Sequence, residues 1–381
     1  INNLIRSLIL KRDFAEADKY QKLSEKLEIK NNIYFINKAE ILFFKKKYEE
    51  AENILEEFCK KNKNDIRANI SLSLIYSNLG KFKNSYKLIE DIYKIYPNNN
   101  TLNLIQSMNL LKHGNFKEGW KLYNKSLQIK DNYYPTIPFW KGEKLEKKKI
   151  IVYEDQGIGD SIQFSKFLFY LKKICNDIRI EIRESVVELF QTNILNLKVY
   201  KKGSNLNSDC DYKISFASLN NFFYENKNKR EKKLFKIEQE IILKWAKKIN
   251  SKKLKVGLTW SGSLYGVNEP FRSIELASLK KILSLDCDFF CLQKDIWDRD
   301  KKYFEDSKIN YLGDNNFLEI AAIIENLDLV ISTDTSILHL SSTLEKLTWG
   351  LISFNPEWRW WEYNNPFFYK TLVEYKQDKF D

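Results

Sequence analysis

The first 130 residues contain an internal repeat with a period of 34 residues, and this repeat constrains the fold more than any other feature of the sequence. An aromatic residue recurs once in each unit, at Phe14, Tyr48, Phe82 and Phe116. A small residue follows three positions later, at Ala17, Ala51, Ser85 and Gly119. Between these positions the apolar residues fall at helical spacing, so each unit is predicted to form two helices.

The turn and end signals of the units agree with this period. Gly80 and Gly114 each stand two residues before the aromatic position, where a tight turn between helices needs a permissive backbone. Pro97 closes the third unit at a place where a helix must stop. The combined pattern resembles the tetratricopeptide repeat. The resemblance implies a domain of four units over residues 1–130 that stack into an α-solenoid.

Two interpretations of the repeats remain open. Their concave groove suits an extended peptide or a protein partner, but repeats that only support the following domain fit the sequence equally well. The first unit is expected to lack most of its first helix, and the chain begins at Ile1 without an initiator Met. We therefore expect more of the superhelix upstream of this sequence.

After residue 131 the pattern changes from helical repeats to alternating strands and helices. A linker rich in proline and aromatic residues covers 132–142. Short β-branched or aromatic runs then predict strands at 149–154, 178–182, 197–200, 212–216, 255–260, 289–293, 327–332 and 348–352. Helical segments separate most of them, which is the pattern of parallel α/β sheets. The sequence predicts two Rossmann-like lobes, 131–235 and 236–381, that face a cleft with ligands at the carboxyl ends of the strands.

The first candidate site is the turn after the first of these strands. Gln156, Gly157 and Gly159 let the backbone approach a ligand closely, and Asp160 stands at the start of the next helix. A carboxylate in this place can accept a proton from an attacking hydroxyl. The alternative is a helix-capping aspartate with no chemical role. The third glycine of a dinucleotide fingerprint is missing, because Phe164 occupies its place, and this disfavours a nicotinamide dehydrogenase.

The second candidate turn follows the first strand of the second lobe. It begins at Trp260 and Ser261 and reaches Arg272, one of few arginines in the chain. A guanidinium group here can bind a diphosphate through paired hydrogen bonds. The alternative is an ordinary surface ion pair between Arg272 and Glu269 or Glu275.

The third candidate turn joins a strand to a helix through small hydroxyl residues. The backbone N–H groups of Thr335 and Ser336 are expected to form an anion site at the helix start. Asp334 precedes them, and His339, one of two histidines, lies in the first helical turn, where it can bond a phosphate or Asp334. The alternative is a capping Asp334 and a packed His339.

These stretches together resemble the C-terminal domain of tetratricopeptide-repeat glycosyltransferases related to the heptosyltransferases, which belong to glycosyltransferase family 9 and have a GT-B fold. The resemblance extends over residues 132–362. The matching stretches are 138–142, 154–164, 257–262, 271–274, 328–340 and 358–360.

The resemblance implies an inverting, metal-independent transfer of a sugar from a nucleotide-sugar donor to a protein or glycan acceptor. The lobe at 131–235 would then face the acceptor and the lobe at 236–381 the nucleotide sugar. Asp160 matches the position of the family's proposed base, and Arg272 matches a basic residue near the donor phosphates. Thr335, Ser336 and His339 match the donor diphosphate loop. The rival interpretation is a non-catalytic interaction scaffold with a degenerate transferase domain.

The charge and cysteine composition of the sequence argues against nucleic acids and metal ions as ligands. The net charge of +12 comes mostly from lysines interleaved with acidic residues, which is typical of a solvated surface rather than of a nucleic-acid reader. Asp209-Cys210-Asp211 has the letters of a metal-binding Asp-x-Asp but is interpreted as a turn, and the five cysteines lack metal-site spacing. We expect no metal, and no cofactor apart from the nucleotide-sugar co-substrate. We also expect no transmembrane segment, and a cytoplasmic location that includes the inner membrane surface.

Overall fold

The computed structural model describes residues 1–11, 13–130, 134–204, 206, 209–226, 233–263, 272–361 and 369–379. The chain divides into two units, one built on Ile1–Leu110 and the other on Leu111–Gln377. Within the described residues, no helix is both long enough and apolar enough to cross a membrane. All five cysteines are free thiols.

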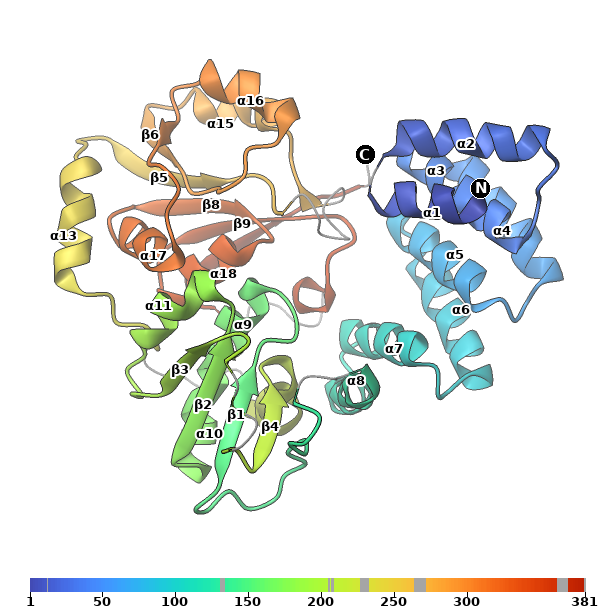
Figure 1. Ribbon diagram of the computed structural model, residues 1–381. Coiled ribbons are helices and arrows are strands. Elements are labelled where there is room, and N and C mark those ends of the chain that lie inside the picture. Colours follow the sequence, from blue (N-terminus) through green and yellow to red (C-terminus); the bar gives the residue numbers. More distant parts are fainter. Residues whose placement is uncertain are drawn as a thin grey trace. The chain divides into compact units, whose positions relative to one another are not determined.

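The first unit is a series of helix pairs, one pair for each 34-residue repeat (Figure 1). Its helices are α1 (Asn2–Leu10), α2 (Phe14–Lys26), α3 (Asn32–Phe44), α4 (Tyr48–Lys61), α5 (Ile66–Asn78), α6 (Phe82–Ile95) and most of α7 (Asn100–Lys112). The helix α1 has nine residues, whereas α3 and α5 have 13. The first repeat therefore keeps more of its first helix than the sequence predicts.

The repeat positions have the structural roles that their residue types predict. The small residues Ala17, Ala51 and Ser85 are buried, at exposures of 0%, 0% and 4%, so neighbouring helices approach each other closely there. Gly80 and Gly114 have φ angles of 74° and 78°, which is the left-handed region that favours glycine. Lys46 stands at the same position one unit earlier and also has a left-handed φ, of 62°.

The helix α8 (Phe116–Lys130) has the phase of a fourth repeat but belongs to the second unit. The ring of Phe116 lies 4.4 Å from that of Tyr224, and Trp120 packs edge-on against Trp358 at 5.1 Å. These aromatic contacts hold α8 against the α/β domain. They explain why the compact units divide at residue 110, whereas the repeat pattern extends to residue 130.

The first lobe of the second unit is built on a four-stranded parallel sheet in the order β3-β2-β1-β4. Its strands are β1 (Lys149–Tyr153), β2 (Asp177–Ile182), β3 (Lys198–Lys201) and β4 (Tyr212–Ser215). The helical segment between β1 and β2 has a break: α9 (Ile158–Phe164) and α10 (Leu168–Ile174) flank a 3-10 turn at Ser165–Phe167. The remaining helices are α11 (Val187–Gln191) and α12 (Asn220–Phe223).

The second lobe contains a six-stranded parallel sheet in the order β10-β9-β8-β5-β6-β7. Its strands are β5 (Leu254–Thr259), β6 (Cys287–Cys291), β7 (Asn310–Tyr311), β8 (Leu329–Thr333), β9 (Thr348–Ile352) and β10 (Leu372–Lys376). Its helices include α13 (Gln239–Lys248), α15 (Lys280–Leu283), α16 (Asp298–Glu305), α17 (Phe317–Glu325) and α18 (Ser336–Thr343). The predicted fold class, a helical solenoid followed by two α/β lobes, is confirmed.

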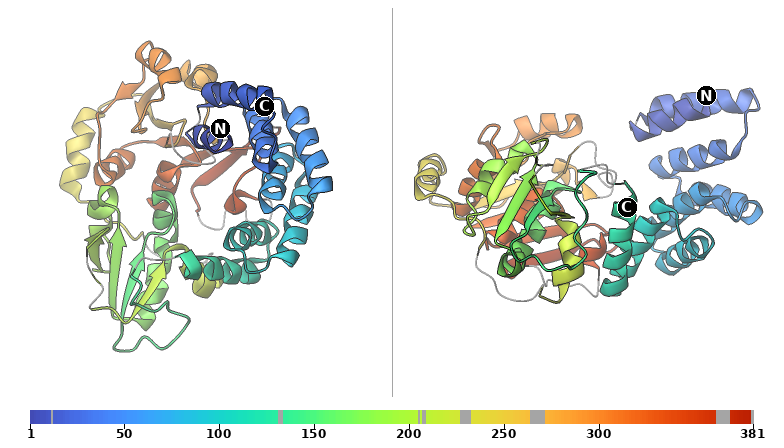
Figure 2. Two further views of the ribbon diagram at one scale, coloured as in Figure 1. Left: turned by 45° about the vertical axis from the view of Figure 1, so that its right-hand side comes forward. Right: turned by 60° about the horizontal axis from the view of Figure 1, so that its bottom comes forward.

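Two helices join the lobes. The helix α9 of the first lobe lies against α18 of the second, as the views in Figures 1 and 2 agree. Gly159 makes this approach possible, because a Cβ atom there would lie 2.7 Å from Cδ2 of His339 and 3.4 Å from Cα of Ser336. The two turns that carry the first and third candidate sites are therefore brought together.

Candidate functional site

Asp160 makes a direct ionic contact between the two lobes. Its Oδ1 accepts a hydrogen bond from Nη2 of Arg359 at 2.6 Å, and its Oδ2 accepts one from the backbone N–H of Gly157 at 3.0 Å. Asp160 lies in the first turn of α9 rather than at the N-cap, which is Gly157. Both carboxylate oxygens are therefore positioned, one by its own lobe and one by the opposite lobe.

Arg359 is the centre of the site, although the sequence analysis did not select it. Its side chain is 5% exposed and also contacts Glu357, with 3.2 Å between Nη2 and Oε2. Burial disfavours the charged guanidinium, but the negative charges of Asp160, Glu357 and Asp334 outweigh it and raise the pKa of Arg359. Arg359 therefore stays cationic among three carboxylates.

His339, in α18, contacts three polar residues of the second lobe. Its Nε2 lies 3.5 Å from Oδ1 of Asp334 and 3.4 Å from Nη1 of Arg359, and its Nδ1 lies 2.8 Å from the hydroxyl of Tyr369. Burial and the nearby charge of Arg359 lower the pKa of His339, despite the opposing effect of Asp334. The imidazole is therefore neutral at pH 7.

The pKa of Asp334 is also lowered, but for a carboxyl group this favours the charged form. Burial alone would raise its pKa, but the hydrogen bond with His339 and the charges of Arg359 and Arg272 hold the pKa of Asp334 well below its usual range. Its carboxylate is therefore ionised and faces the cations rather than capping α18, whose N-cap is Thr335.

The start of α18 has the composition that the sequence predicts. Thr335 is 8% exposed and its hydroxyl lies 3.1 Å from that of Ser332. Ser336 is the first residue of the helix and is partly exposed. The positive end of the helix dipole thus lies beside Asp334, in the part of the site nearest to Arg359.

The first two residues of the second predicted turn, Trp260 and Ser261, are buried and have partners within the second lobe. Trp260 is fully buried, its indole N–H donates to Oδ2 of Asp300 at 3.1 Å, and its ring packs on Phe304. Ser261 is 2% exposed, and its backbone N–H donates to Gln293 at 2.9 Å. These contacts place both residues in the core of the second lobe.

Arg272 lies at the end of this turn, of which residues 264–271, with Glu269 and Phe271, fall outside the described part of the chain. Arg272 is partly exposed, and its charge contributes to lowering the pKa of Asp334. Arg272 thus lies within electrostatic reach of Asp334.

The first-lobe side of the site holds a second carboxyl group, Asp155, which the sequence analysis did not select. The hydroxyl of Tyr123, in α8, donates to Oδ2 of Asp155 at 2.7 Å and accepts a hydrogen bond from Nε2 of Gln156. Burial raises the pKa of Asp155 to about 6, and the negative charge of Asp160 adds to the effect. The first turn therefore carries a group that titrates close to neutral pH.

Two residues that shape the site had weak sequence signals. Arg359 is one of nine arginines in a lysine-rich chain and stands between Trp358 and Trp360. A lone arginine surrounded by tryptophans is the signal that points to a buried cation. Asp155 had no such signal, because its raised pKa depends on burial and on Tyr123, 32 positions away.

The acidic residues considered as metal ligands have structural partners. Asp209 pairs with Arg179 at 2.5 Å and with Lys149, and Asp211 accepts from Lys148 at 2.9 Å. The Asp-x-Asp segment thus anchors the edge of the first sheet, as a turn. Among the described residues, no group of three or more His, Cys, Asp or Glu side chains is arranged to hold a metal ion.

The sequence matches no protein-family model and no curated protein. Among solved structures, the chain is similar to a glycosyltransferase family 9 protein from Veillonella parvula. The two are 12% identical, the match covers 61% of this chain and 88% of that chain, and the TM-score is 0.46. It is also similar to the iron-containing heptosyltransferase TibC of enterotoxigenic E. coli, in complex with ADP-D-β-D-heptose. The two are 11% identical, the match covers 62% of this chain and 67% of that chain, and the TM-score is 0.43.

The repeats have a structural likeness of their own. A tetratricopeptide repeat protein from Parabacteroides merdae is similar over 34% of this chain and 52% of that chain, at 14% identity and a TM-score of 0.29. The fold and the site thus define a helical-repeat chain joined to a two-lobed α/β domain with an ion-paired centre.

Proposed function

We propose that the second unit is a glycosyltransferase that moves a sugar from a nucleotide-sugar donor to a hydroxyl of a protein or glycan acceptor, with inversion at the anomeric carbon and without a metal ion. The observation that carries the proposal is the contact between Asp160 of the first lobe and Arg359 of the second. A carboxylate that can take a proton stands opposite a buried cation that can hold a diphosphate.

In the proposed reaction, Asp160 takes the proton of the acceptor hydroxyl while the acceptor oxygen attacks the anomeric carbon. The bond from that carbon to the donor phosphate breaks, and the nucleoside diphosphate leaves with the bonding electron pair. The growing negative charge on the leaving group meets Arg359, Arg272 and the N-terminus of α18. The balance of charge therefore needs no further cation.

The ion pair between Asp160 and Arg359 gives the reaction an order. While Arg359 binds Asp160, one oxygen of the proposed base is occupied at 2.6 Å. A donor diphosphate carries more negative charge than one carboxylate, so it competes for the guanidinium group. Donor binding would then release Asp160 to accept the acceptor proton, and the base would act only after the donor is in place.

His339 and Asp155 have supporting roles in this proposal. A neutral His339 has a single N–H donor, which faces Asp334 at Nε2. A donor phosphate that replaces Asp334 as its partner can accept this hydrogen bond without an added charge. Asp155 and Tyr123 form a polar pair on the acceptor side, where they can position the acceptor hydroxyl next to Asp160.

A binding experiment tests the proposal. All nine tryptophans lie in the second unit, so tryptophan fluorescence follows the melting of that unit alone. A nucleoside diphosphate at one hundred times its Kd stabilises a protein by about 2.7 kcal/mol, which raises the melting temperature by at least about 5 °C. We expect one member of a panel of nucleoside diphosphates to produce this shift.

The Arg359→Lys variant should lose most of the shift, because a lysine cannot form the paired hydrogen bonds of a guanidinium group. The matched control is Arg67→Lys, which changes an exposed arginine of the first unit and should leave the shift intact. If no nucleoside diphosphate stabilises the wild-type protein, the non-catalytic scaffold is the better interpretation.

A further inference from the structure

Gln163, in α9, has a buried side-chain amide without a hydrogen-bond partner. The residue is 2% exposed, and neither its Oε1 nor its Nε2 has a partner among the residues that the structure describes. A buried amide in this state costs free energy, because folding removes its hydrogen bonds to water and does not replace them. A ligand that completes these hydrogen bonds would explain why the sequence keeps a glutamine here.

The place of Gln163 on α9 directs its side chain toward the junction of the lobes. Gly159 lies one turn earlier on the same face of the helix, and this is where α9 approaches His339 and Ser336 of α18. Long side chains on a helix point back over the preceding turn. For Gln163 this turn carries Gly159 and Asp160, so its amide is directed toward the proposed base.

The second lobe has unpartnered buried donors at the same junction. Nε of Arg359 and Nε1 of Trp360 have no hydrogen-bond partner in the described ranges, and these residues are 5% and 3% exposed. The Trp360 ring stacks on that of His339, with 5.8 Å between the centroids and an angle of 19°. Polar atoms without a partner therefore occur on both sides of the contact between Asp160 and Arg359.

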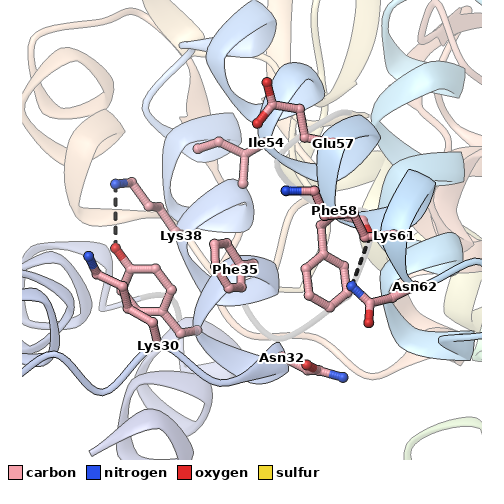
Figure 3. A pocket seen from close by; sticks show the side chains of 10 residues that line it. Lys30, Asn32, Phe35, Lys38, Ile54, Glu57, Phe58, Lys61 and Asn62 are labelled. Carbon is pink, nitrogen blue, oxygen red and sulfur yellow. Dashed lines mark hydrogen bonds between the residues drawn. The ribbon is translucent and has the colours of Figure 1, made fainter.

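The pocket between α3 and α4 of the first unit has a different character (Figure 3). Its volume is about 440 Å³, and its polar lining residues Lys30, Asn32 and Lys61 are exposed. Water satisfies the hydrogen bonds of exposed groups, so their presence does not require a ligand. The buried amide of Gln163 lacks this access to water.

The chemistry of the amide indicates which part of a nucleotide sugar it would bind. An amide both donates and accepts hydrogen bonds, and so does a hydroxyl group. A diphosphate offers mainly acceptors, so it would pair with Nε2 of Gln163 and leave Oε1 unpaired. In the proposed reaction the transferred sugar lies between Asp160 and the diphosphate held by Arg359. Its hydroxyl groups are therefore the partners that best fit Gln163.

We propose that Gln163 hydrogen-bonds a hydroxyl group of the transferred sugar and so helps to determine which donor is used. The inference rests on the proposed function and deepens it, because it assigns a residue of the first lobe to the sugar of the donor. The sugar hydroxyl would restore the hydrogen bonds that the amide loses on folding. A donor whose sugar has no hydroxyl in this place would leave the amide unpaired and bind less tightly.

The first test uses Gln163→Met, because methionine has a similar length and no amide. Removal of an unpaired buried amide should stabilise the ligand-free protein, so we expect the melting temperature in tryptophan fluorescence to rise by about 2–5 °C. The matched control is Gln191→Met, which makes the same change at an exposed position of α11 and should shift the melting temperature by less than about 1 °C. An unchanged or lower melting temperature in Gln163→Met would overturn the proposal.

The second test measures binding by isothermal titration calorimetry in pairs: UDP with UDP-glucose, ADP with ADP-glucose and GDP with GDP-mannose. For at least one pair, we expect Gln163→Met to weaken the nucleotide sugar about tenfold and its nucleoside diphosphate less than about twofold. Gln191→Met should leave both affinities unchanged. An equal loss for both members of every pair that binds, or no loss for either, would overturn the sugar as the partner of Gln163. If no nucleoside diphosphate binds the wild-type protein, the proposed function itself fails, and this assignment fails with it.

Discussion

The raised pKa of Asp155 predicts that the contribution of this residue to the stability of the second unit falls as the pH rises from 4 to 8. Burial and the charge of Asp160 move the pKa of this carboxyl from an ordinary value of 3.8 to about 6 in the folded protein. Each pKa unit corresponds to about 1.4 kcal/mol, so ionisation of Asp155 costs the folded state about 3 kcal/mol. A group with a raised pKa stabilises the fold fully below its unfolded pKa, and this stabilisation is lost as the pH rises through the folded pKa.

The Asp155→Asn variant removes this titration but can still accept a hydrogen bond from Tyr123. Urea unfolding followed by tryptophan fluorescence gives the free energy of unfolding of the second unit at each pH. We expect the stability of Asp155→Asn relative to wild type to increase by about 2.5 kcal/mol between pH 4 and pH 8, because the unfolded carboxyl is already partly ionised at pH 4.

Asp209→Asn is a control variant, for which the pH dependence of the stability relative to wild type has the opposite sign. Hydrogen bonds from Lys149 and Arg179 lower the pKa of Asp209 to about 2, so its contribution is present at neutral pH and fades as the pH falls. Asp209→Asn should therefore lose stability relative to wild type at pH 8 and recover part of it at pH 4. A pH-independent difference between Asp155→Asn and wild type would refute the argument that Asp155 is buried as a near-neutral acid.

Further predictions concern the backbone and the junction of the lobes. Lys46→Gly should stabilise the first unit by about 0.5–1 kcal/mol, because Lys46 has a φ of 62°, and Gly80→Ala should destabilise it; thermal unfolding by circular dichroism at 222 nm measures both. Gly159→Ala should destabilise the second unit by about 1–3 kcal/mol in urea unfolding, because its Cβ would lie 2.7 Å from His339. Gly157→Ala, whose Cβ would lie 3.2 Å from a flexible Asp160 oxygen, should have a smaller effect, and an equal effect would contradict the packing argument.

Much of the fold could be predicted because its signals are local and periodic. The repeat phase predicted the turn at Gly80 and the buried Ala51, since each depends only on its own unit. The strand β10 was not predicted, because Leu372–Lys376 lacks the continuous apolar pattern of a buried strand and lies at the edge of its sheet. The division into compact units at residue 110 is not visible in the repeat period, since Trp120 of α8 packs against Phe164, 44 positions away in the sequence.

Some residues of the candidate site could likewise be predicted from the sequence, whereas others could not. Asp160, His339 and Asp334 could be selected because each follows a strand at a turn, and the structure brings these three together around Arg359. Arg359 itself follows no such turn, and its importance comes from carboxyl groups that the fold gathers around it, among them Asp160, 199 positions away in the sequence. A sequence shows which residues can be charged, but the cost of burying them is set by the tertiary structure.

The central claim is that Asp160 is the base of a sugar transfer and that Arg359 exchanges it for a donor diphosphate. The most direct measurement compares Asp160→Asn with wild type, once a donor nucleotide has been identified, for both transfer rate and nucleoside diphosphate affinity. We expect transfer to fall by about 10²–10⁴, because the general base is removed. The affinity should be kept or increased, because Arg359 no longer has Asp160 as a competing partner. Unchanged turnover in Asp160→Asn, or loss of nucleotide binding together with activity, would contradict the account.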